Sequence, residues 1–198
     1  MTERSFSLIP FSSLDIPDIS ITGSISLQHG VLKIHYALIG EIQEIVLPSR
    51  SVHPGRRDEL WMGTCFECFL AVMEQPGYWE LNLAPSGDWN AYRMDAYRRI
   101  GFREEASIEQ VQIEAWRERG PNAADAFYLN ASVDLSRLFQ RDILLQAGIT
   151  AVIQMKNGNE TYWALSHPAP QADFHVRESF ILRLARQTRP LTESAPGG

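Results

Sequence analysis

The stretch LWMGTCFECFLAVMEQPGYWELNLAPSGDWNAYRMDAYR, residues 60–98, decides the fold that we predict for this chain. Two segments within it, EQPG at residues 74–77 and PSGD at residues 85–88, have the composition of turns. Proline pre-sets φ and glycine tolerates positive φ, so both segments can reverse the chain. Between them the side chains alternate in character, as they do in strands. The stretch therefore predicts three antiparallel strands joined by two short turns.

The position of each turn sets the register of the strands that it joins. A turn that closes symmetrically about its two central residues would place Leu70 opposite Leu81, and Leu81 opposite Tyr92. One face is then apolar and predicts the core: Phe66, Cys68, Leu70, Val72, Trp79, Leu81, Leu83, Tyr92 and Met94. The other face mixes aromatic and polar side chains: Glu67, Phe69, Ala71, Glu80, Asn82, Trp89, Ala91, Arg93 and Asp95.

This mixed face has two interpretations. Glu80 falls opposite Arg93 in the predicted register, as an opposite-charge pair across two strands. A face of this composition can be ordinary solvent-exposed surface. It can also be a ligand platform, because sugars need flat aromatic surfaces for their C–H faces. Their hydroxyl groups need planar carboxylate, amide and guanidinium groups.

Length and charge limit the possible functions. The chain has 198 residues, and we predict one domain over residues 1–186 with a polar, disordered tail over residues 187–198. The net charge is −6 and there is no run of Lys or Arg, which disfavours nucleic-acid binding. The start, MTERSFSLIPFSS, has no basic segment followed by an apolar run, and no segment is long and apolar enough to cross a membrane. A cytoplasmic location is the expectation.

The rest of the chain also reads as strands and turns. Further strands are predicted at residues 25–27, 31–38, 42–47, 110–116, 127–133, 149–156, 160–165 and 179–184. Asn157-Gly158 is a strong hairpin signal, and residues 134–139 look like one helical turn capped by Asp134. Cys65 and Cys68 lie three apart on a strand, so their sulfurs should point to opposite faces as unbridged thiols. About ten or eleven strands predict an all-β fold, an antiparallel β-sandwich of two sheets.

The segments LWMGTCFECFL, YWELNLAPSGDWNAYRMDAYR and YWALSHPAPQADFH resemble the DOMON-like domains of bacterial proteins, over residues 32–180. These domains are similar to family 9 carbohydrate-binding modules and to haem- or sugar-binding DOMON domains. The resemblance implies a two-sheet sandwich with a ligand at its concave face or rim.

The same resemblance implies roles for particular residues. In the carbohydrate-binding members a Trp stacks on the sugar and a Glu six residues later binds hydroxyl groups, a spacing that matches Trp61 and Glu67. Glu80 and Asn82 match two polar positions on the next strand, although Glu80 stands where a basic residue is expected. A second stacking residue could be Trp163 or Trp89. We therefore predict a non-catalytic domain that binds a carbohydrate or a similar small polar ligand, with Arg93 as a further hydrogen-bonding group.

Haem is an alternative ligand, because haem-binding relatives use a Met and a His as axial ligands. The candidates are Met62, Met73, Met94, Met155, His35, His167 and His175, and no Met–His pair stands out by spacing.

Two further alternatives involve a metal ion or catalysis. His167, Asp173 and His175 could bind a divalent metal, as part of an enzyme or an enzyme-associated module, or could fix their loop to the sheet through hydrogen bonds. Glu67 and Glu80 could act as acid and base on a glycosidic bond. Pairing with Arg93 would keep Glu80 ionised, which argues against hydrolysis. The sequence does not indicate an oligomeric state.

Overall fold

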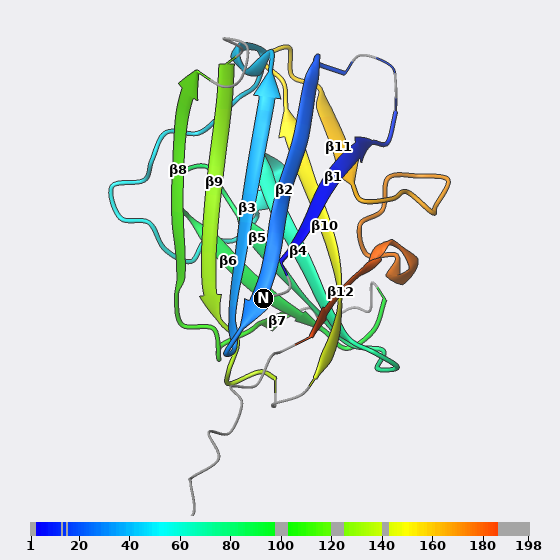
Figure 1. Ribbon diagram of the computed structural model, residues 1–198. Helices are drawn as coiled ribbons and strands as arrows, with labels where there is room; N and C mark the ends of the chain where they lie inside the picture. The colour runs from blue at the N-terminus through cyan, green and yellow to red at the C-terminus, as the bar shows by residue number, and fades with distance from the viewer. Residues whose placement is uncertain are drawn as a thin grey trace, which may run out of the picture.

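The computed structural model describes residues 3–12, 14, 16–97, 103–119, 125–139 and 143–185 (Figure 1). The predicted tail, residues 187–198, lies outside the described residues. Within them are twelve strands: β1 (Arg4–Pro10), β2 (Ile19–Gln28), β3 (Val31–Gly40), β4 (Cys65–Val72), β5 (Tyr78–Leu83), β6 (Trp89–Met94), β7 (Arg103–Glu104), β8 (Val111–Arg119), β9 (Asp125–Asp134), β10 (Leu144–Gln154), β11 (Glu160–Ala164) and β12 (Leu182–Ala185).

Helical structure in the described ranges is limited to short 3₁₀ segments: η1 (Ile42–Glu44), η2 (Leu60–Met62) and η4 (Arg177–Ser179). None of the described helices has the length and apolar character needed to cross a membrane. The predicted helical turn is a single hydrogen-bonded turn, in which Asp134 Oδ1 accepts the N–H of Ser136 at 2.8 Å and the Phe139 N–H reaches Leu135 O at 3.1 Å. The all-β, antiparallel prediction is confirmed.

The strands form one continuous sheet in the order β7-β6-β5-β4-β10-β11-β1-β2-β3-β9-β8, with β12 paired to β10. Continuity depends on β1, whose residues Arg4 to Leu8 pair with β2 while Ile9 and Pro10 pair with β11. We call β1, β2, β3, β9 and β8 the β3 half, and β11, β10, β4, β5, β6, β7 and β12 the β4 half. In Figure 1 the β3 half crosses in front of the β4 half. The structure therefore has one curled sheet where the sequence predicted two separate ones.

The main core fills the space between the two halves. Tyr36 of β3 lies against Phe66 of β4 at 4.8 Å between ring centroids, and Phe66 stacks on Phe127 of β9 at 6.0 Å. The Tyr36 hydroxyl is buried and donates to the main-chain oxygen of Glu67 at 2.8 Å. Because this inner side is filled, the free surface for a ligand lies on the outer faces of the two halves.

The first predicted hairpin keeps its two faces. Leu70 lies opposite Trp79, where Leu81 was predicted, so the register differs by two residues and the side-chain alternation is preserved. Cys68 belongs to the core, while Cys65 lies on the same outward-facing set as Glu67. Both cysteines are free and buried, as predicted.

The second hairpin is shifted by one residue, which exchanges the faces of β6. Leu81 lies opposite Ala91, and Glu80 lies opposite Tyr92 rather than Arg93. The cause is the turn: the Ala84 N–H donates to the Asp88 main-chain oxygen at 2.9 Å across three residues, with Gly87 at φ +87°, so the turn is not centred on two residues. Tyr92 and Met94 therefore lie on the outer face, where they are buried in a second apolar cluster, and their predicted place in the core on the opposite face was wrong.

Candidate ligand-binding site

Two carboxyl groups lie side by side on the outer face of the β4 half. Glu67 on β4 pairs with Asn82 on β5, and Glu80 on β5 pairs with Phe69 on β4. The two glutamates are thus diagonal neighbours on one face of an antiparallel pair, within reach of each other. Glu67 is 3% exposed and Glu80 is 6% exposed.

Burial changes the acidity of both groups. Removal from water raises the pKa of Glu67 well above its usual value of 4.5, and the neighbouring Glu80 raises it further. Burial also raises the pKa of Glu80 to about 7. Because a buried charge is costly, burial shifts the pair toward retaining a proton.

Few hydrogen-bond donors reach this pair. Thr150 of β10 donates from Oγ1 to Glu67 Oε2 at 3.0 Å, and Asn82 donates from Nδ2 to Glu80 Oε1 at 2.9 Å. Both bonds favour the ionised carboxylate, but they do not offset the desolvation. Asn82 Oδ1 is buried and has no hydrogen-bond partner within the described ranges. Among the described residues, the acceptor oxygens of the two glutamates and Asn82 therefore outnumber the side-chain donors that reach them.

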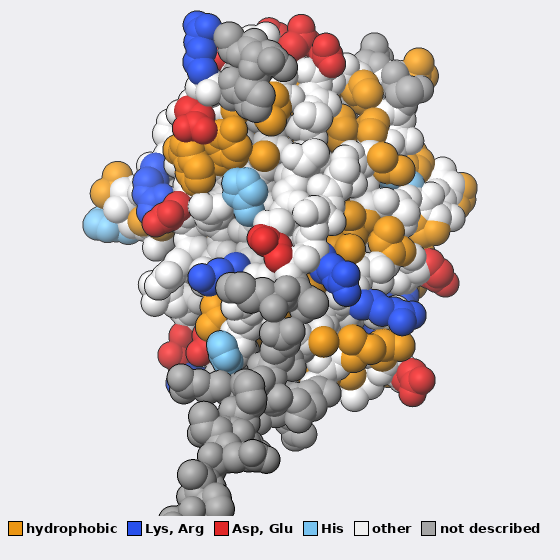
Figure 2. Space-filling model, viewed as in Figure 1, with side chains coloured by type: hydrophobic (Ala, Val, Ile, Leu, Met, Phe, Trp, Pro, Cys, Tyr) orange, Lys and Arg blue, Asp and Glu red, His pale blue; other side chains and the backbone are white. Residues whose placement is uncertain are grey.

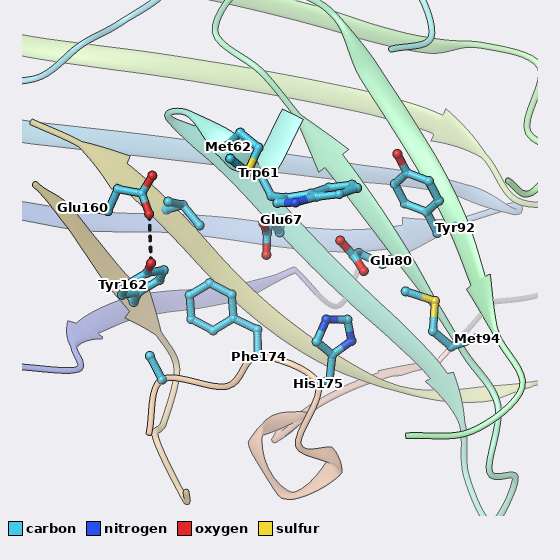
Figure 3. A pocket seen from close by; sticks show the side chains of 12 residues that line it. Trp61, Met62, Glu67, Glu80, Tyr92, Met94, Glu160, Tyr162, Phe174 and His175 are labelled. Carbon is cyan, nitrogen blue, oxygen red and sulfur yellow. Dashed lines mark hydrogen bonds between the residues drawn. The ribbon is translucent and has the colours of Figure 1, made fainter. Parts of the chain in front are cut away.

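The segment before β4 supplies one wall of the site. Glu59 adopts a left-handed conformation (φ 58°, ψ 27°) and starts η2, which carries Trp61 and Met62 over the outer face. The Trp61 ring meets the Tyr92 ring edge to face at 5.6 Å. In Figure 3 the indole extends over Glu67 and toward Tyr92.

The loop between β11 and η4 supplies the opposite wall, with Phe174 and His175. His175 Nδ1 shares a hydrogen bond of 2.8 Å with the Tyr78 hydroxyl, and its ring lies 5.3 Å from the Phe69 ring. Beneath them Phe180 packs on Phe69 at 5.4 Å.

Phe180 can occupy this position because residue 148 is a glycine. A Cβ at Gly148 would lie 2.7 Å from Phe180 Cδ1. The second wall thus rests on a small aromatic cluster that is separate from the main core.

Between the walls is a cavity of about 380 Å³ (Figure 3). It is lined by Trp61, Met62, Glu67, Glu80, Tyr92, Met94, Val152, Glu160, Tyr162, Ala172, Phe174 and His175. We call it the outer pocket. Its volume is within the range of small-molecule sites, and it combines an aromatic lining with a few convergent polar groups.

A hydrogen-bonded cluster braces the β6 side of the outer pocket. Asn90 Nδ2 donates to the Tyr92 hydroxyl at 2.9 Å, and that hydroxyl donates to Asp58 Oδ1. Arg56 donates to Asn90 Oδ1 at 2.7 Å, and its guanidinium lies 4.4 Å from the Trp89 ring centroid. Burial raises the pKa of Tyr92, with a further rise from Asp58, so the hydroxyl stays protonated and can donate.

The structure brings together only part of the predicted site. Trp61, Glu67 and Glu80 line the outer pocket, and Asn82 lies beside the two glutamates. Trp89 and Trp163 are buried in the main core, on the inner face of the sheet. Arg93 is exposed and lies 5.5 Å from the Trp79 ring, away from the pocket, because of the register shift in β6.

Several lining residues were missed by the sequence reasoning, which had placed Tyr92 and Met94 in the core and had not singled out Phe174 or Tyr162. A three-residue turn places Tyr92 and Met94 on the outer face, but the composition of residues 85–88 does not distinguish it from a two-residue turn. His175 was singled out as a metal candidate and instead lines the outer pocket.

The three predicted metal candidates do not form a cluster. His167 Nε2 bonds to Ile9 O at 3.0 Å, whereas Asp173 accepts from the Tyr97 hydroxyl at 2.6 Å and from the His175 N–H at 2.9 Å. In the described part of the chain, no three His, Cys, Asp or Glu side chains are grouped as metal ligands. The observed contacts of these residues are hydrogen bonds that hold their loop, which is the other alternative that the sequence left open.

For haem, the structure brings Met62, Met94 and His175 to one pocket, a combination that the sequence spacing did not indicate. The described part of the pocket lining also includes Glu67, Glu80 and Glu160 and no Lys or Arg. Haem carries two carboxylate groups of its own, which this acidic lining would repel, and its apolar ring would cover buried carboxyl groups. The residues present do not fit haem.

Comparison with known proteins supports the fold. No protein-family model matches the chain, and no curated protein matches it in sequence. A putative carbohydrate-binding protein from Bacteroides uniformis has a TM-score of 0.61 and 12% identity, over 92% of this chain and 87% of that one. At this identity the likeness shows a shared fold.

Two solved structures of a family 9 carbohydrate-binding module from Caldicellulosiruptor kristjanssonii are also similar, each at 12% identity. The complex with cellotriose has a TM-score of 0.48, over 93% of this chain and 84% of that one. The complex with glucose has a TM-score of 0.46, over 89% and 81% respectively. The DOMON-like assignment remains a prediction.

Proposed function

We propose that this protein is a non-catalytic carbohydrate-binding domain and that the outer pocket is its binding site. The observation that carries the proposal is the position of Trp61 over the Glu67–Glu80 pair in a cavity of about 380 Å³. The indole offers a flat apolar surface to the C–H face of a sugar ring. The two carboxyl groups below it accept hydrogen bonds from hydroxyl groups.

Other residues of the outer pocket have defined roles in this proposal. Phe174 and Tyr162, with ring centroids 6.1 Å apart, form the far wall against which the second face of a sugar ring can rest. This is the role that the sequence reasoning offered to Trp89 or Trp163. Asn82 orients Glu80, and the Tyr92 hydroxyl group is held as a donor to Asp58. The similar fold of the putative carbohydrate-binding protein from Bacteroides uniformis is consistent with this function.

Calorimetric titration with a panel of soluble mono- and oligosaccharides tests the proposal. Trp61→Ala should weaken binding by about 30-fold or more, because a stacking aromatic residue is a typical hot spot worth ~2 kcal/mol or more. The matched control is Trp116→Ala, which removes an indole from the outer face of the β3 half, where Trp116 is 37% exposed. Equal binding by the wild-type protein and Trp61→Ala would contradict the proposal.

Glycoside hydrolysis is a second candidate, favoured by the acidity of Glu80. The predicted ion pair with Arg93 is wrong, and burial raises the pKa of Glu80 to about 7, the range of a general acid at neutral pH. Release of reducing ends from oligosaccharides, absent in Glu80→Gln, would support this candidate. Binding without any product release in the wild-type protein would exclude it for the sugars tested.

A further inference from the structure

The charge of the outer pocket is one-sided. Among the residues that the structure describes, its lining includes Glu67, Glu80 and Glu160 and one imidazole, that of His175, but no Lys or Arg. Within the described ranges, the ion pairs involve Asp88, Asp95 and Glu109 and none involves the two buried glutamates. No cation of the described residues therefore pairs with the two buried carboxyl groups.

The described hydrogen-bonding groups around the two glutamates are also unbalanced, with more acceptors than donors. When both carboxyl groups are ionised they offer four acceptor oxygens, and Asn82 Oδ1 is a fifth, buried and unpaired within the described ranges. The donors that reach them are Thr150 Oγ1 and Asn82 Nδ2. A neutral hydroxyl group supplies one donor and no charge. A neutral sugar would therefore not offset the negative charge that forms when both carboxyl groups ionise. An ammonium group supplies three donors and a full positive charge.

The walls also suit a cation. Trp61, Tyr92, Tyr162 and Phe174 surround the space above the glutamates, and aromatic faces attract cations through their quadrupoles. An aromatic enclosure over an acidic floor is a chemistry that recognises a positively charged nitrogen.

We infer that the ligand of the outer pocket carries a positively charged nitrogen, and that it is a sugar with a free amine seated on Glu67 and Glu80. The sugar part of this inference rests on the proposed function. The ammonium group donates to both carboxylates and allows both to ionise, so the shared proton leaves on binding. Trp61 covers the ring of the same sugar.

Pairs of sugars that differ only in acetylation of the amine give a direct test. Glucosamine oligosaccharides and their N-acetylated counterparts have the same ring, but acetylation removes the charge. Titrations slightly below neutral pH should show the amine form binding about 10-fold tighter or more. Calorimetry in buffers of different ionisation enthalpy should show release of up to about one proton with the amine and none with the amide.

Glutamine variants connect the effect to the two carboxyl groups. Glu67→Gln and Glu80→Gln should each reduce proton release, and the double variant should abolish it and should bind both sugar forms equally. Glu114→Gln, an exposed change on the β3 half, should keep the amine preference. Thermal unfolding of each variant checks that the fold is retained.

The other outcomes separate the two proposals. Equal binding of amine and N-acetyl sugars by the wild-type protein overturns the inference and leaves the proposed function intact. If no sugar binds but tetramethylammonium or ethanolamine does, cation recognition stands and carbohydrate binding is overturned. If neither class of probe binds, both are overturned.

Discussion

The two outer faces of the curled sheet carry similar side chains in different surroundings. Both alternate with an inner apolar set, and both present carboxyl, amide and hydroxyl groups. On the β3 half these include Glu114, Gln112 and Asn130, which border an open polar surface. Figure 2 shows this face, with polar side chains over β2 and β3 and a hydrophobic patch over β8 and β9. On the β4 half, Glu67 and Glu80 are buried.

The difference comes from what covers each face. The η2 segment and the loop before η4 extend over the β4 half and enclose the outer pocket. The aromatic rings show the same contrast. The Trp116 ring stacks on the Tyr128 ring, with centroids 5.2 Å apart and ring planes at 24°, whereas the Trp61 and Tyr92 ring planes meet at 67°. Strand alternation alone produces a polar face. The connecting segments that cover it form a pocket, and burial in that pocket raises the pKa of its glutamates.

The largest expected effect on stability is at Phe180, which lies under the loop that covers the outer pocket. Phe180 is buried against Phe69 and Tyr78, so Phe180→Ala should lower the free energy of unfolding by about 3–5 kcal/mol. Urea denaturation with the midpoint and slope compared to wild type measures this. Trp116→Ala on the open face is the control and should cost less than ~1 kcal/mol. Similar losses for both variants would mean that the loop support is no better packed than the open face.

The next effect is a dependence of stability on pH that only the buried face should produce. The pKa of Glu80 rises on folding from 4.5 to about 7, so the folded state binds the proton more tightly than the unfolded state. The stabilisation is complete below the unfolded pKa and is lost as pH rises through about 7, by roughly 3 kcal/mol in total. Glu67, whose pKa is also raised, adds in the same direction.

Glu80→Gln tests this dependence. The variant should lose much of the decline in stability with pH and should be more stable than wild type in mildly alkaline solution. Denaturation curves across the pH range measure it, with Glu114→Gln on the open face as the control that keeps the wild-type profile. A wild-type stability that rises from mildly acidic to mildly alkaline solution would refute the expected direction.

The smallest effect concerns one hydrogen bond. Thr150 Oγ1 donates to buried Glu67, so Thr150→Val should cost about 1–2 kcal/mol and raise the pKa of Glu67 further. Thr22→Val, at a half-buried position on the outer face of β2, should change stability by less than about 0.5 kcal/mol. The measurement is the free energy of unfolding of both variants. Because the substitution is the same, the difference between them reports the surroundings of each threonine.

Much of the fold was predictable because alternation is a local property. The strands of residues 60–98, the Asn157-Gly158 hairpin and the unbridged cysteines followed from the sequence. Trp61, Glu67 and Glu80 were also identified. The predicted register of the first hairpin was wrong by two residues, and a shift of two leaves each side chain on its predicted face. The register of the second hairpin was wrong by one residue, so Trp89 and Arg93 were predicted on the outer face in place of Tyr92 and Met94. The reason is that a three-residue turn containing Gly87 cannot be distinguished by composition from a two-residue turn.

The sequence by itself determined an all-β antiparallel chain and an acidic, tryptophan-bearing strand pair, because side-chain alternation and turn chemistry act over a few residues. The tertiary structure decided that β1 joins two halves into one sheet, and that residues 172–175 meet Trp61 across Glu67 and Glu80. It also decided the raised pKa values of those glutamates. Desolvation depends on which distant segments cover a group, and no local pattern encodes that covering.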